Sequence, residues 1–559
     1  MNILNYFPFQ SFRPYQERIL KELEDFFSSY NYFMLEAPTG FGKSAVAYTL
    51  ARWVLANFSS YSHICVADKF LQEQYLSSFS DLVMVKGRGN FLCPYSPIGE
   101  PTCAEAMCTV IQSMNCPHKP RPERIETITG SMPIFDDHGI LYDWSYVDEV
   151  GAVHCPYWVQ KDAGIRNDIT VHNYHYFLYE QNYAKSFAQR ALGIFDEAHI
   201  VEKILMGFVE RNILLRTLNN IWRERYPNER YKFTIPYLSY IDQWLEWIHS
   251  VWGVLLNLHD YYDDLIKANP EKQDVGTKYR RYKDMIDRLK TATEFLSSDP
   301  DNWVYLREDD RVTFKPVTIR EFSPYLFNHV NKTLLMSATI LDHEKLKRYL
   351  GIKEDVKFIR VNESTFPVKN RPIYQDHRDK ATAKTMERYL PKMLDRLDNY
   401  YIPNKGQNKG VVHTHTHKIA EYILRNSDHR NIMVSNTGSE DARDKVFQDF
   451  FDADAPCVMI SPSMNLGVDL YDERCRWQLI VKIPYPYLGD PQIRKRMEVD
   501  PDWYDYQTLM SLIQCYGRGC RSTTDWCETY VTDTMFAWLI SKNKDSLPKW
   551  FFEAIRRMT

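Results

Sequence analysis

The chain has 559 residues and a formal net charge of −4, and 44% of its residues are hydrophobic and 14% aromatic. So small a charge excludes a whole-molecule field that would attract nucleic acid, so a polyanion must be bound by local basic patches. No apolar run approaches the roughly 18–20 residues that span a bilayer, and residues 1–16 lack the pattern of a signal peptide. We therefore expect an intracellular protein of roughly three to five domains that binds no membrane, cytoplasmic if its source is prokaryotic or viral.

A glycine-rich loop follows the first of four short apolar runs early in the chain. Each run precedes a polar turn and a helix-like pattern, which predicts buried parallel strands of an α/β sheet within residues 32–40, 63–68, 191–199 and 333–339. The loop, APTGFGKS, fits the P-loop pattern except that Ala37 stands where the commonest form has glycine. Its N–H groups would surround phosphate oxygens of ATP, Lys43 would reach the β- and γ-phosphates, and Ser44 would hold Mg²⁺. The predicted nucleotide contacts are Thr39, Gly40, Gly42, Lys43 and Ser44.

Residues 86–165 are rich in cysteine, proline and glycine and show little periodicity, as expected where a metal replaces a hydrophobic core. Five of the eleven cysteines lie here: Cys93, Cys103, Cys108, Cys116 and Cys155. Thiols stay reduced inside cells, so clustered cysteines indicate a metal or catalysis before disulfides. Thiolates hold both zinc and iron–sulfur clusters, and the lack of a C-x-x-C pair favours iron–sulfur without deciding between them. The nearby His118 and His154 are expected at the surface.

The third apolar run ends in two acidic residues, within IFDEAH. Asp196 ends the strand, where open α/β sheets place ligand groups, and we expect it to hold Mg²⁺ through water. We expect Glu197 to orient and deprotonate the attacking water. Residues 205–315 then change character, since apolar residues recur every three or four positions and predict a helical insertion. Its Trp and Tyr residues are interpreted as packing core, with a base-stacking surface as the alternative.

Five later apolar runs predict a second parallel sheet, within residues 410–416, 431–436, 456–462, 478–484 and 528–533. Between the last two runs, QCYGRGCR places Gln514, Arg518 and Arg521 on one short predicted helical segment, with the arginines on one face. Phosphoryl transfer needs positive charge at the γ-phosphate, and such arginines are worth about 10³–10⁵ in rate. A further group, His413, His415 and His417, is predicted on one face of a strand, and we interpret it as part of the sheet rather than as a metal site.

The order of these motifs resembles that of superfamily 2 helicases, and specifically of the XPD/DinG group. SFRPYQ is similar to the Q motif, which implies that Gln16 contacts the adenine base, and VADKFLQEQY is similar to motif Ia. MSAT and SMNLGVDL are similar to motifs III and V, which implies that Thr339 and Asp469 couple the ATP site to nucleic acid. Gly467 and Asp469 of motif V are counted among the expected cofactor-binding residues.

Three further segments, VKGRGNFLC, CPYW and ITVHNYHYFL, are similar to those that open, close and follow the iron–sulfur domain of the group. The resemblance implies a [4Fe–4S] cluster held by four cysteines. Cys93 and Cys155 match the first and last ligands, and Cys108 and Cys116 are chosen as the middle two, with Cys103 as the alternate. It also implies two RecA-like motor domains, residues 1–85 with 166–204 and 316–350, then 351–559. An iron–sulfur domain (86–165) and a helical Arch-like insertion (205–315) would interrupt the first.

The function implied by the resemblance is an ATP-dependent DNA helicase that moves 5′→3′ on single-stranded DNA and opens forked or tailed duplexes, as a monomeric motor. The basic stretches KGRGN (86–90) and KPRPER (119–124) are candidates for gripping the strand, although such runs are often merely solvated. An alternative is a nucleic-acid-stimulated ATPase that acts on RNA–DNA hybrids or remodels without processive unwinding. A catalytically idle scaffold is the third hypothesis, and intact Lys43, Glu197 and Arg518 argue against it.

Overall fold

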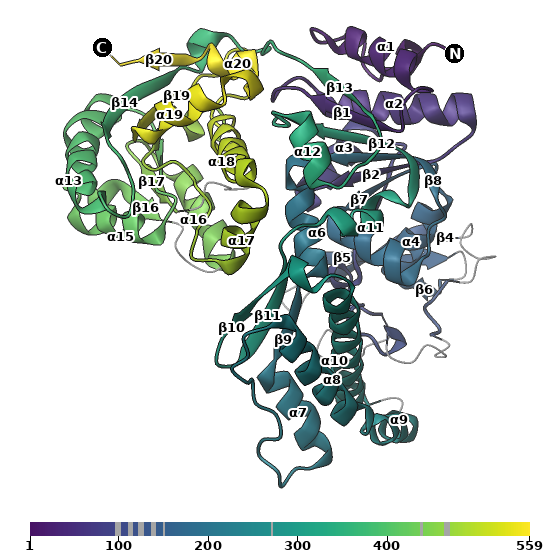
Figure 1. Cartoon of the computed structure of the whole chain (residues 1–559). Coiled ribbons are helices and arrows are strands. Elements are labelled where there is room, and N and C mark those ends of the chain that lie inside the picture. The colour runs from purple at the N-terminus through teal and green to yellow at the C-terminus, as the bar shows by residue number, and fades with distance from the viewer. Residues whose placement is uncertain are drawn as a thin grey trace.

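The computed structural model has two lobes, each built on a parallel sheet, and two insertions that extend from the first lobe (Figure 1). It describes residues 1–94, 102–109, 116–120, 128–135, 141–148, 151–269, 272–435, 440–462 and 470–558. Over these residues, no helix combines the length and the hydropathy that a bilayer crossing needs.

The first lobe contains a seven-stranded parallel sheet covered by helices on both faces. The strand order is β13-β1-β12-β8-β2-β7-β3, with bounds Val356–Arg360, Tyr32–Glu36, Val330–Ser337, Arg190–Asp196, Ser62–Val66, Ile169–Asn173 and Val83–Val85. Because successive side chains of a strand point to opposite faces, Phe33 and Leu35 pack into one core cluster with helices α1 (Gln16–Phe26) and α2 (Lys43–Phe58), and Met34 packs into another.

The second lobe also contains a seven-stranded parallel sheet. Its order is β16-β17-β15-β18-β19-β14-β20, with bounds Met433–Ser435, Val458–Ser461, Gly410–His413, Trp477–Ile480, Glu528–Asp533, Ile373–Asp379 and Ile555–Arg557. Every run that the sequence predicts as a strand overlaps a strand of one of these two sheets. The predicted fold class of two parallel-sheet motor domains is therefore confirmed.

The boundary predicted at residue 350 lies too early. Strand β13 belongs to the first sheet, where it pairs with β1 from Tyr32 opposite Val356 to Glu36 opposite Arg360. The half-buried Arg360 guanidinium is hydrogen-bonded to the fully buried Glu36 carboxylate, which also accepts the N–H groups of Ile340 and Leu341. The first lobe thus ends beyond Arg360.

The first insertion, which carries the clustered cysteines, contains an antiparallel sheet in the order β4-β5-β6. Its strands are Ile128–Phe135, Leu141–Asp148 and Val153–His154, and helix α4 (Pro156–Arg166) comes next in the chain. The low periodicity of residues 86–165 gave no indication of these strands.

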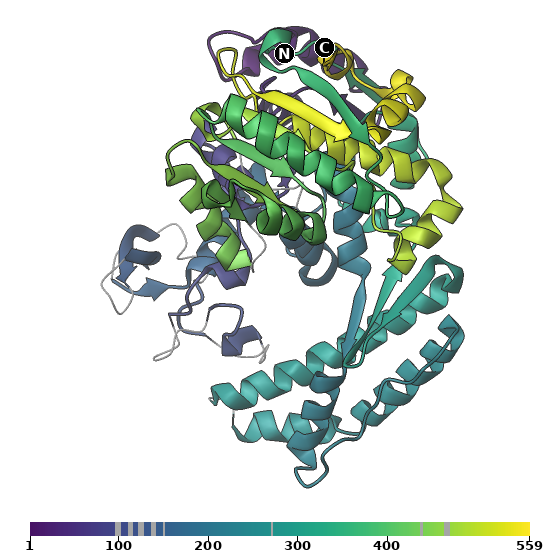
Figure 2. The same ribbon diagram turned by 90° about the vertical axis from the view of Figure 1, so that its left-hand side faces the viewer.

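The second insertion is helical with a small sheet at its base. Helices α7, α8, α9 and α10 span Leu215–Arg225, Ile241–Leu256, His259–Ala268 and Gln273–Ser298. Three antiparallel strands, β9 (Arg211–Leu214), β10 (Trp303–Arg307) and β11 (Arg311–Pro316), were not predicted. Trp244, Tyr262 and Tyr282 are buried in one cluster, as the packing interpretation predicts. Figure 2 shows both insertions. The two are connected by the Arg280 guanidinium of α10, which donates to the Glu105 carbonyl at 2.9 Å.

Helix α18 (Pro501–Tyr516) fastens the second lobe to the first. Its residues Trp503, Leu509 and Ile513 belong to the same core cluster as Met34 and Phe195 of the first sheet. Near its start, the indole N–H of Trp503 donates to Glu202 at 2.9 Å, and the fully buried Arg496 of α17 (Pro491–Val499) pairs with the same carboxylate at 2.6 Å. These contacts therefore hold the last turn of α18 beside the carboxyl end of strand β12 in the first sheet.

Candidate active site

The glycine loop joins β1 to α2, and its conformation requires glycine at two positions. Gly40 and Gly42 have φ of +81° and +85°, values that other residues rarely adopt. Helix α2 begins at Lys43, so its first N–H groups, which have no partner within the helix, open into this loop. The Lys43 ammonium donates to the Ala37 carbonyl at 3.3 Å. The loop thus has the backbone needed to surround phosphate oxygens.

Gln16 stabilises this loop through hydrogen bonds of its side-chain amide. Its side-chain amide donates to the Phe41 carbonyl at 2.8 Å, and its amide oxygen accepts the N–H of Arg13 at 2.8 Å. The Arg13 guanidinium donates to the Gly40 carbonyl at 2.6 Å. Gln16 is therefore placed beside the nucleotide loop, and its contact with a base remains a prediction.

The two acidic residues at the end of β8, Asp196 and Glu197, have opposite pKa shifts. Asp196 is buried, and burial followed by the charge of Glu197 raises the pKa of its carboxyl group. Tyr75 donates to Asp196 at 2.9 Å. Burial alone would raise the pKa of Glu197, but the hydrogen bond and charge of His199, with Lys43 and Arg521, lower it. Glu197 is therefore held as a carboxylate beside the loop lysine.

A chain of polar contacts connects this acidic pair with the second lobe. His199 Nδ1 lies 3.2 Å from Glu197 Oε2 and 3.0 Å from Ser337 Oγ. Gln514 Nε2, in the last turn of α18, donates to the Thr339 hydroxyl at 2.6 Å and lies 3.4 Å from His199 Nδ1. Two predicted residues, Gln514 and Thr339, are thus in direct contact across the lobes.

The two arginines lie beyond the end of α18 rather than on it. The helix ends at Tyr516, and the segment Gly517–Arg521 is a loop, so the predicted shared helical face is wrong. The physical reason is the low helix propensity of glycine, since two of the three residues after Tyr516 are glycines. A Cβ at Gly519 would lie 2.5 Å from Cys527 Sγ, so the loop backbone lies directly on that side chain.

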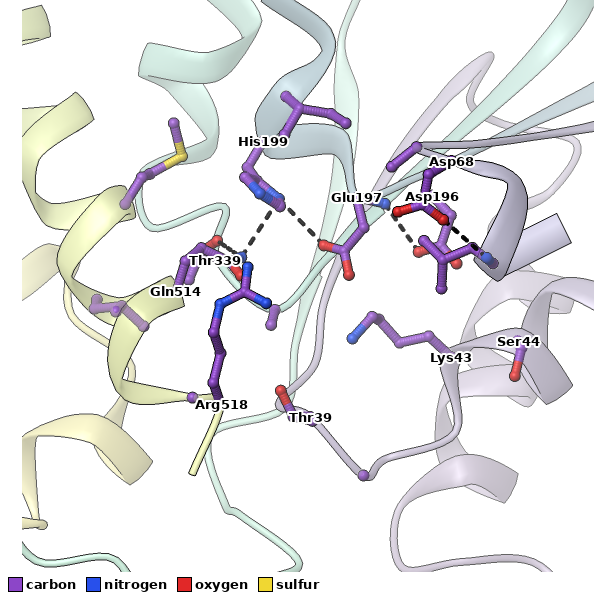
Figure 3. Close-up of a pocket in the computed structure, with 18 of the residues that line it drawn as sticks. Thr39, Lys43, Ser44, Asp68, Asp196, Glu197, His199, Thr339, Gln514 and Arg518 are labelled. Atoms are coloured by element: carbon purple, nitrogen blue, oxygen red, sulfur yellow. Dashed lines mark hydrogen bonds and ion pairs between the residues drawn. The ribbon is translucent and has the colours of Figure 1, made fainter. Parts of the chain in front are cut away.

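Most of the groups described above line one cavity of about 1560 Å³ between the lobes. Figure 3 shows Lys43 and Arg518 entering it from opposite sides, with Glu197 between them. Predicted residues that line it are Gln16, Thr39, Gly40, Gly42, Lys43, Ser44, Asp196, Glu197, Thr339, Gln514, Arg518 and Arg521. Gly467 and Asp469 lie outside the described residues.

The clustered cysteines of the first insertion lie close together. The direct sulfur–sulfur contact involves Cys103, which the sequence ranks only as the alternate ligand. Cys103 Sγ lies 3.7 Å from Cys155 Sγ, and hydrogen bonds with Cys155 and Cys93 raise the pKa of the Cys103 thiol. Burial raises the pKa of Cys108 and Cys116, and the charges of other cysteines of the group contribute to both shifts. Within the part of the chain that the structure describes, no set of three or more His, Cys, Asp or Glu side chains is arranged as a metal site.

Basic and aromatic side chains cover these thiols. The Arg88 guanidinium donates to Cys108 Sγ at 3.7 Å and lies over the rings of Tyr157 and Trp158 at 4.4 and 5.1 Å. The Lys119 ammonium lies 4.1 Å from the centroid of the Trp158 ring. The two basic stretches therefore point at least one side chain each toward the cysteine group, while residues 121–124 lie outside the described residues.

The histidine run does not lie on one face of a strand, because β15 ends at His413. His413 is buried and hydrogen-bonded to Gln478 at 3.2 Å, and burial lowers its pKa to about 4. His415 bonds the Tyr485 carbonyl at 3.0 Å, and His417 begins helix α15 (His417–Asn426). The three histidines therefore lie on a strand, in a loop and at the start of a helix.

Comparison with known proteins finds helicase relatives over part of the chain. Residues 405–554, which include most of the second sheet and the arginine loop, match the family described as Helicase C-terminal domain. A "Regulator of telomere elongation helicase 1 homolog" from Caenorhabditis briggsae is 31% identical over 107 residues, which are 16% of this chain and 10% of the relative. Residues 405–554 are therefore similar to the C-terminal domain of helicases. The match spans only a tenth of this curated relative's length.

Solved structures of XPD-type proteins share the whole fold. The structure titled "XPD_Helicase" aligns with a TM-score of 0.64 at 16% identity, covering 98% of this chain and all of that one. The S. tokodaii Xpd4 structure aligns with a TM-score of 0.58 at 13% identity, over the same shares of the two chains. The arrangement of lobes and insertions is thus an XPD-type fold.

Three residues of the site were not predicted as functional. His199 stands within the IFDEAH motif, so the motif itself carried a signal for it. Tyr75 and Arg13 lie within the segments similar to motif Ia and the Q motif, but nothing in their spacing indicates contacts with Asp196 and Gly40.

Proposed function

We propose that this protein is an ATP-dependent DNA helicase that moves 5′→3′ along single-stranded DNA. The observation that carries the proposal is the shared cavity, which Lys43, Asp196 and Glu197 line from the first lobe and Arg518 and Arg521 line from the second. Hydrolysis of ATP between the lobes changes the contacts that hold the two lobes together. A motor needs such a change in order to move. The polarity and the choice of DNA rest on the likeness to the XPD/DinG group.

Residues of both lobes take part in the proposed hydrolysis of ATP. The loop N–H groups and Lys43 hold the phosphates of ATP, while Ser44 and Asp196 hold Mg²⁺, which when bound neutralises phosphate charge. Glu197 orients the attacking water, and Arg518 with Arg521 brings positive charge to the γ-phosphate. Gln514 connects the second lobe with this site, because its side-chain amide contacts both Thr339 and His199.

Two measurements test this function. Wild-type protein should hydrolyse ATP faster when single-stranded DNA is added, and should separate 5′-tailed duplexes but not 3′-tailed ones. ATP turnover without strand separation on any tailed DNA would indicate a translocase or remodelling ATPase instead, and separation restricted to RNA–DNA hybrids would reassign the substrate. Absence of ATP turnover would refute the enzyme.

We also propose that the cysteines of the first insertion hold an iron–sulfur cluster. Thiolates are the ligands that such clusters use, and the five cysteines interact with one another. The Arg88 guanidinium, whose charge suits an anionic group, donates to Cys108. Cys93 and Cys155 would be ligands, and two of Cys103, Cys108 and Cys116 would complete the set. The direct contact of Cys103 with Cys155 strengthens the case for Cys103, which the sequence ranks as the alternate.

Serine substitutions should separate ligands from bystanders. Protein purified without oxygen should contain about four irons per chain, and Cys93→Ser or Cys155→Ser should lose nearly all of them. Among the other three cysteines, one serine variant should keep the iron and the visible absorption. Cys65→Ser, a buried cysteine of β2 remote from the insertion in sequence, serves as the matched control. Stoichiometric zinc without iron would overturn the assignment.

A further inference from the structure

A buried carboxylate four residues beyond Arg521 organises the arginine loop. Asp525 is 1% exposed, although it lies between α18 and β19 in a connecting segment. Its Oδ2 accepts the backbone N–H of Arg521 at 2.9 Å. Its Oδ1 accepts the guanidinium of Arg476 at 2.8 Å and the N–H groups of Trp526 and Asp472 at 2.8 and 3.1 Å. Both oxygens thus accept only from N–H donors.

These contacts join three parts of the second lobe. Arg476 directly precedes β18 and is almost fully buried, so it anchors Asp525 to the sheet. Asp472 stands just after the segment similar to motif V, and Tyr471 and Arg474 beside it line the nucleotide cavity. Arg521 belongs to the arginine loop and lowers the pKa of Glu197, which lies across the cavity. Asp525 is therefore the shared acceptor of the sheet, the end of motif V and the arginine loop.

The loop needs such a support because the helix does not provide one. Helix α18 ends at Tyr516 and two glycines come within the next three residues, so the described backbone of the loop has no helical hydrogen bond beyond that of Arg518. The hydrogen bond from Arg521 to Asp525 restrains the far end of this loop. A charge-assisted bond of this kind is stronger than a neutral one, particularly where water is excluded.

We propose that Asp525 is a positioning residue that holds Arg521 toward the γ-phosphate site. The inference deepens the proposed ATP hydrolysis and rests on it. Among the described residues, Asp525 contacts neither the nucleotide loop nor the acidic pair, so it acts through the Arg521 backbone. Its loss should lower turnover without weakening the binding of the nucleotide.

The Asp525→Asn variant tests this with little change in size. The amide would place N–H groups against N–H donors, so at least one of the four contacts is lost. We expect kcat for DNA-stimulated ATP hydrolysis to fall about ten- to hundredfold, while KM and the Kd for nucleotide stay at wild-type values. Glu473→Gln is the matched control, because Glu473 pairs with the same Arg476 at 2.9 Å but is 83% exposed. It should leave kcat unchanged.

A double-mutant cycle distinguishes positioning from general damage. If Asp525 acts through Arg521, adding Asp525→Asn to Arg521→Ala should lower kcat no further. A wild-type kcat in Asp525→Asn, or a full multiplication of the two losses, would overturn the inference. Should Asp525→Asn fail to fold, Arg476→Lys takes its place with the same expectations and the same disproof. Wild-type protein without any ATP turnover would instead refute the proposed function.

Discussion

Replacing Glu197 with glutamine should slow ATP hydrolysis by about 10²–10⁴-fold while nucleotide binding is retained. Glutamine keeps the size of the side chain but removes the charge that orients and accepts a proton from water. The charge of Glu197 also raises the pKa of Asp196, so its removal should help Asp196 to ionise and hold Mg²⁺. Binding of Mg²⁺–nucleotide should therefore be equal or tighter in the variant, although turnover collapses.

Steady-state turnover and the Kd for a nonhydrolysable nucleotide measure the two effects separately. Glu344→Gln is a suitable control, since Glu344 is a well-exposed carboxylate of the same lobe in helix α12 (His343–Tyr349). Undiminished turnover in the Glu197 variant would remove this carboxylate from the reaction. Loss of turnover together with loss of binding would mean that Glu197 holds the site together rather than acting on water.

The parallel sheets were predictable because their strands are short, apolar and buried on both faces. β1 and β8 each end in polar residues at the same sheet edge, so the amino-acid sequence alone places the glycine loop and the acidic pair together. Five strands of the two sheets were not predicted, namely β3, β7, β13, β14 and β20. Two of them have a pattern that differs from that of the predicted strands. β13 and β20, with the sequences VKFIR and IRR, are edge strands whose charged residues break the apolar run.

The insertions were less predictable for a related reason. The sheet at the base of the helical insertion pairs β9 with β11 across about a hundred residues, and no local pattern reveals such a partner. Strands β4 and β5 lie among cysteines, prolines and glycines, which conceal the alternation of an antiparallel pair. Long-range pairing, rather than local preference, forms these elements.

The site shows the same limit. Motif spacing predicted which residues line the cavity, but not the contacts that orient them. The helical face expected for Arg518 and Arg521 is replaced by a loop, because the glycines end α18 and Asp525 supports the far end of that loop. Contacts such as Tyr75 with Asp196, 121 residues apart, depend on the fold as a whole.

Replacing Arg518 with alanine should lower ATP turnover by about 10³–10⁵-fold and leave nucleotide binding nearly intact. The side chain enters the cavity from the second lobe, opposite Lys43 (Figure 3). Its charge reaches the γ-phosphate only when the lobes hold the nucleotide between them, so it stabilises the transition state more than the bound substrate. Arg518→Lys should recover only part of the rate, because an ammonium lacks the planar fork of the guanidinium.

Two comparisons make this result specific to the junction of the lobes. Arg425→Ala removes a 78%-exposed arginine from α15 of the same lobe and should leave turnover unchanged. Glu197→Gln and Arg518→Ala should both retain nucleotide, yet strand separation should stop in both, since each blocks hydrolysis from a different lobe. Normal turnover in Arg518→Ala would remove Arg518 from the chemistry, and normal turnover in both Arg518→Ala and Arg521→Ala would contradict a motor driven by closure of this cavity.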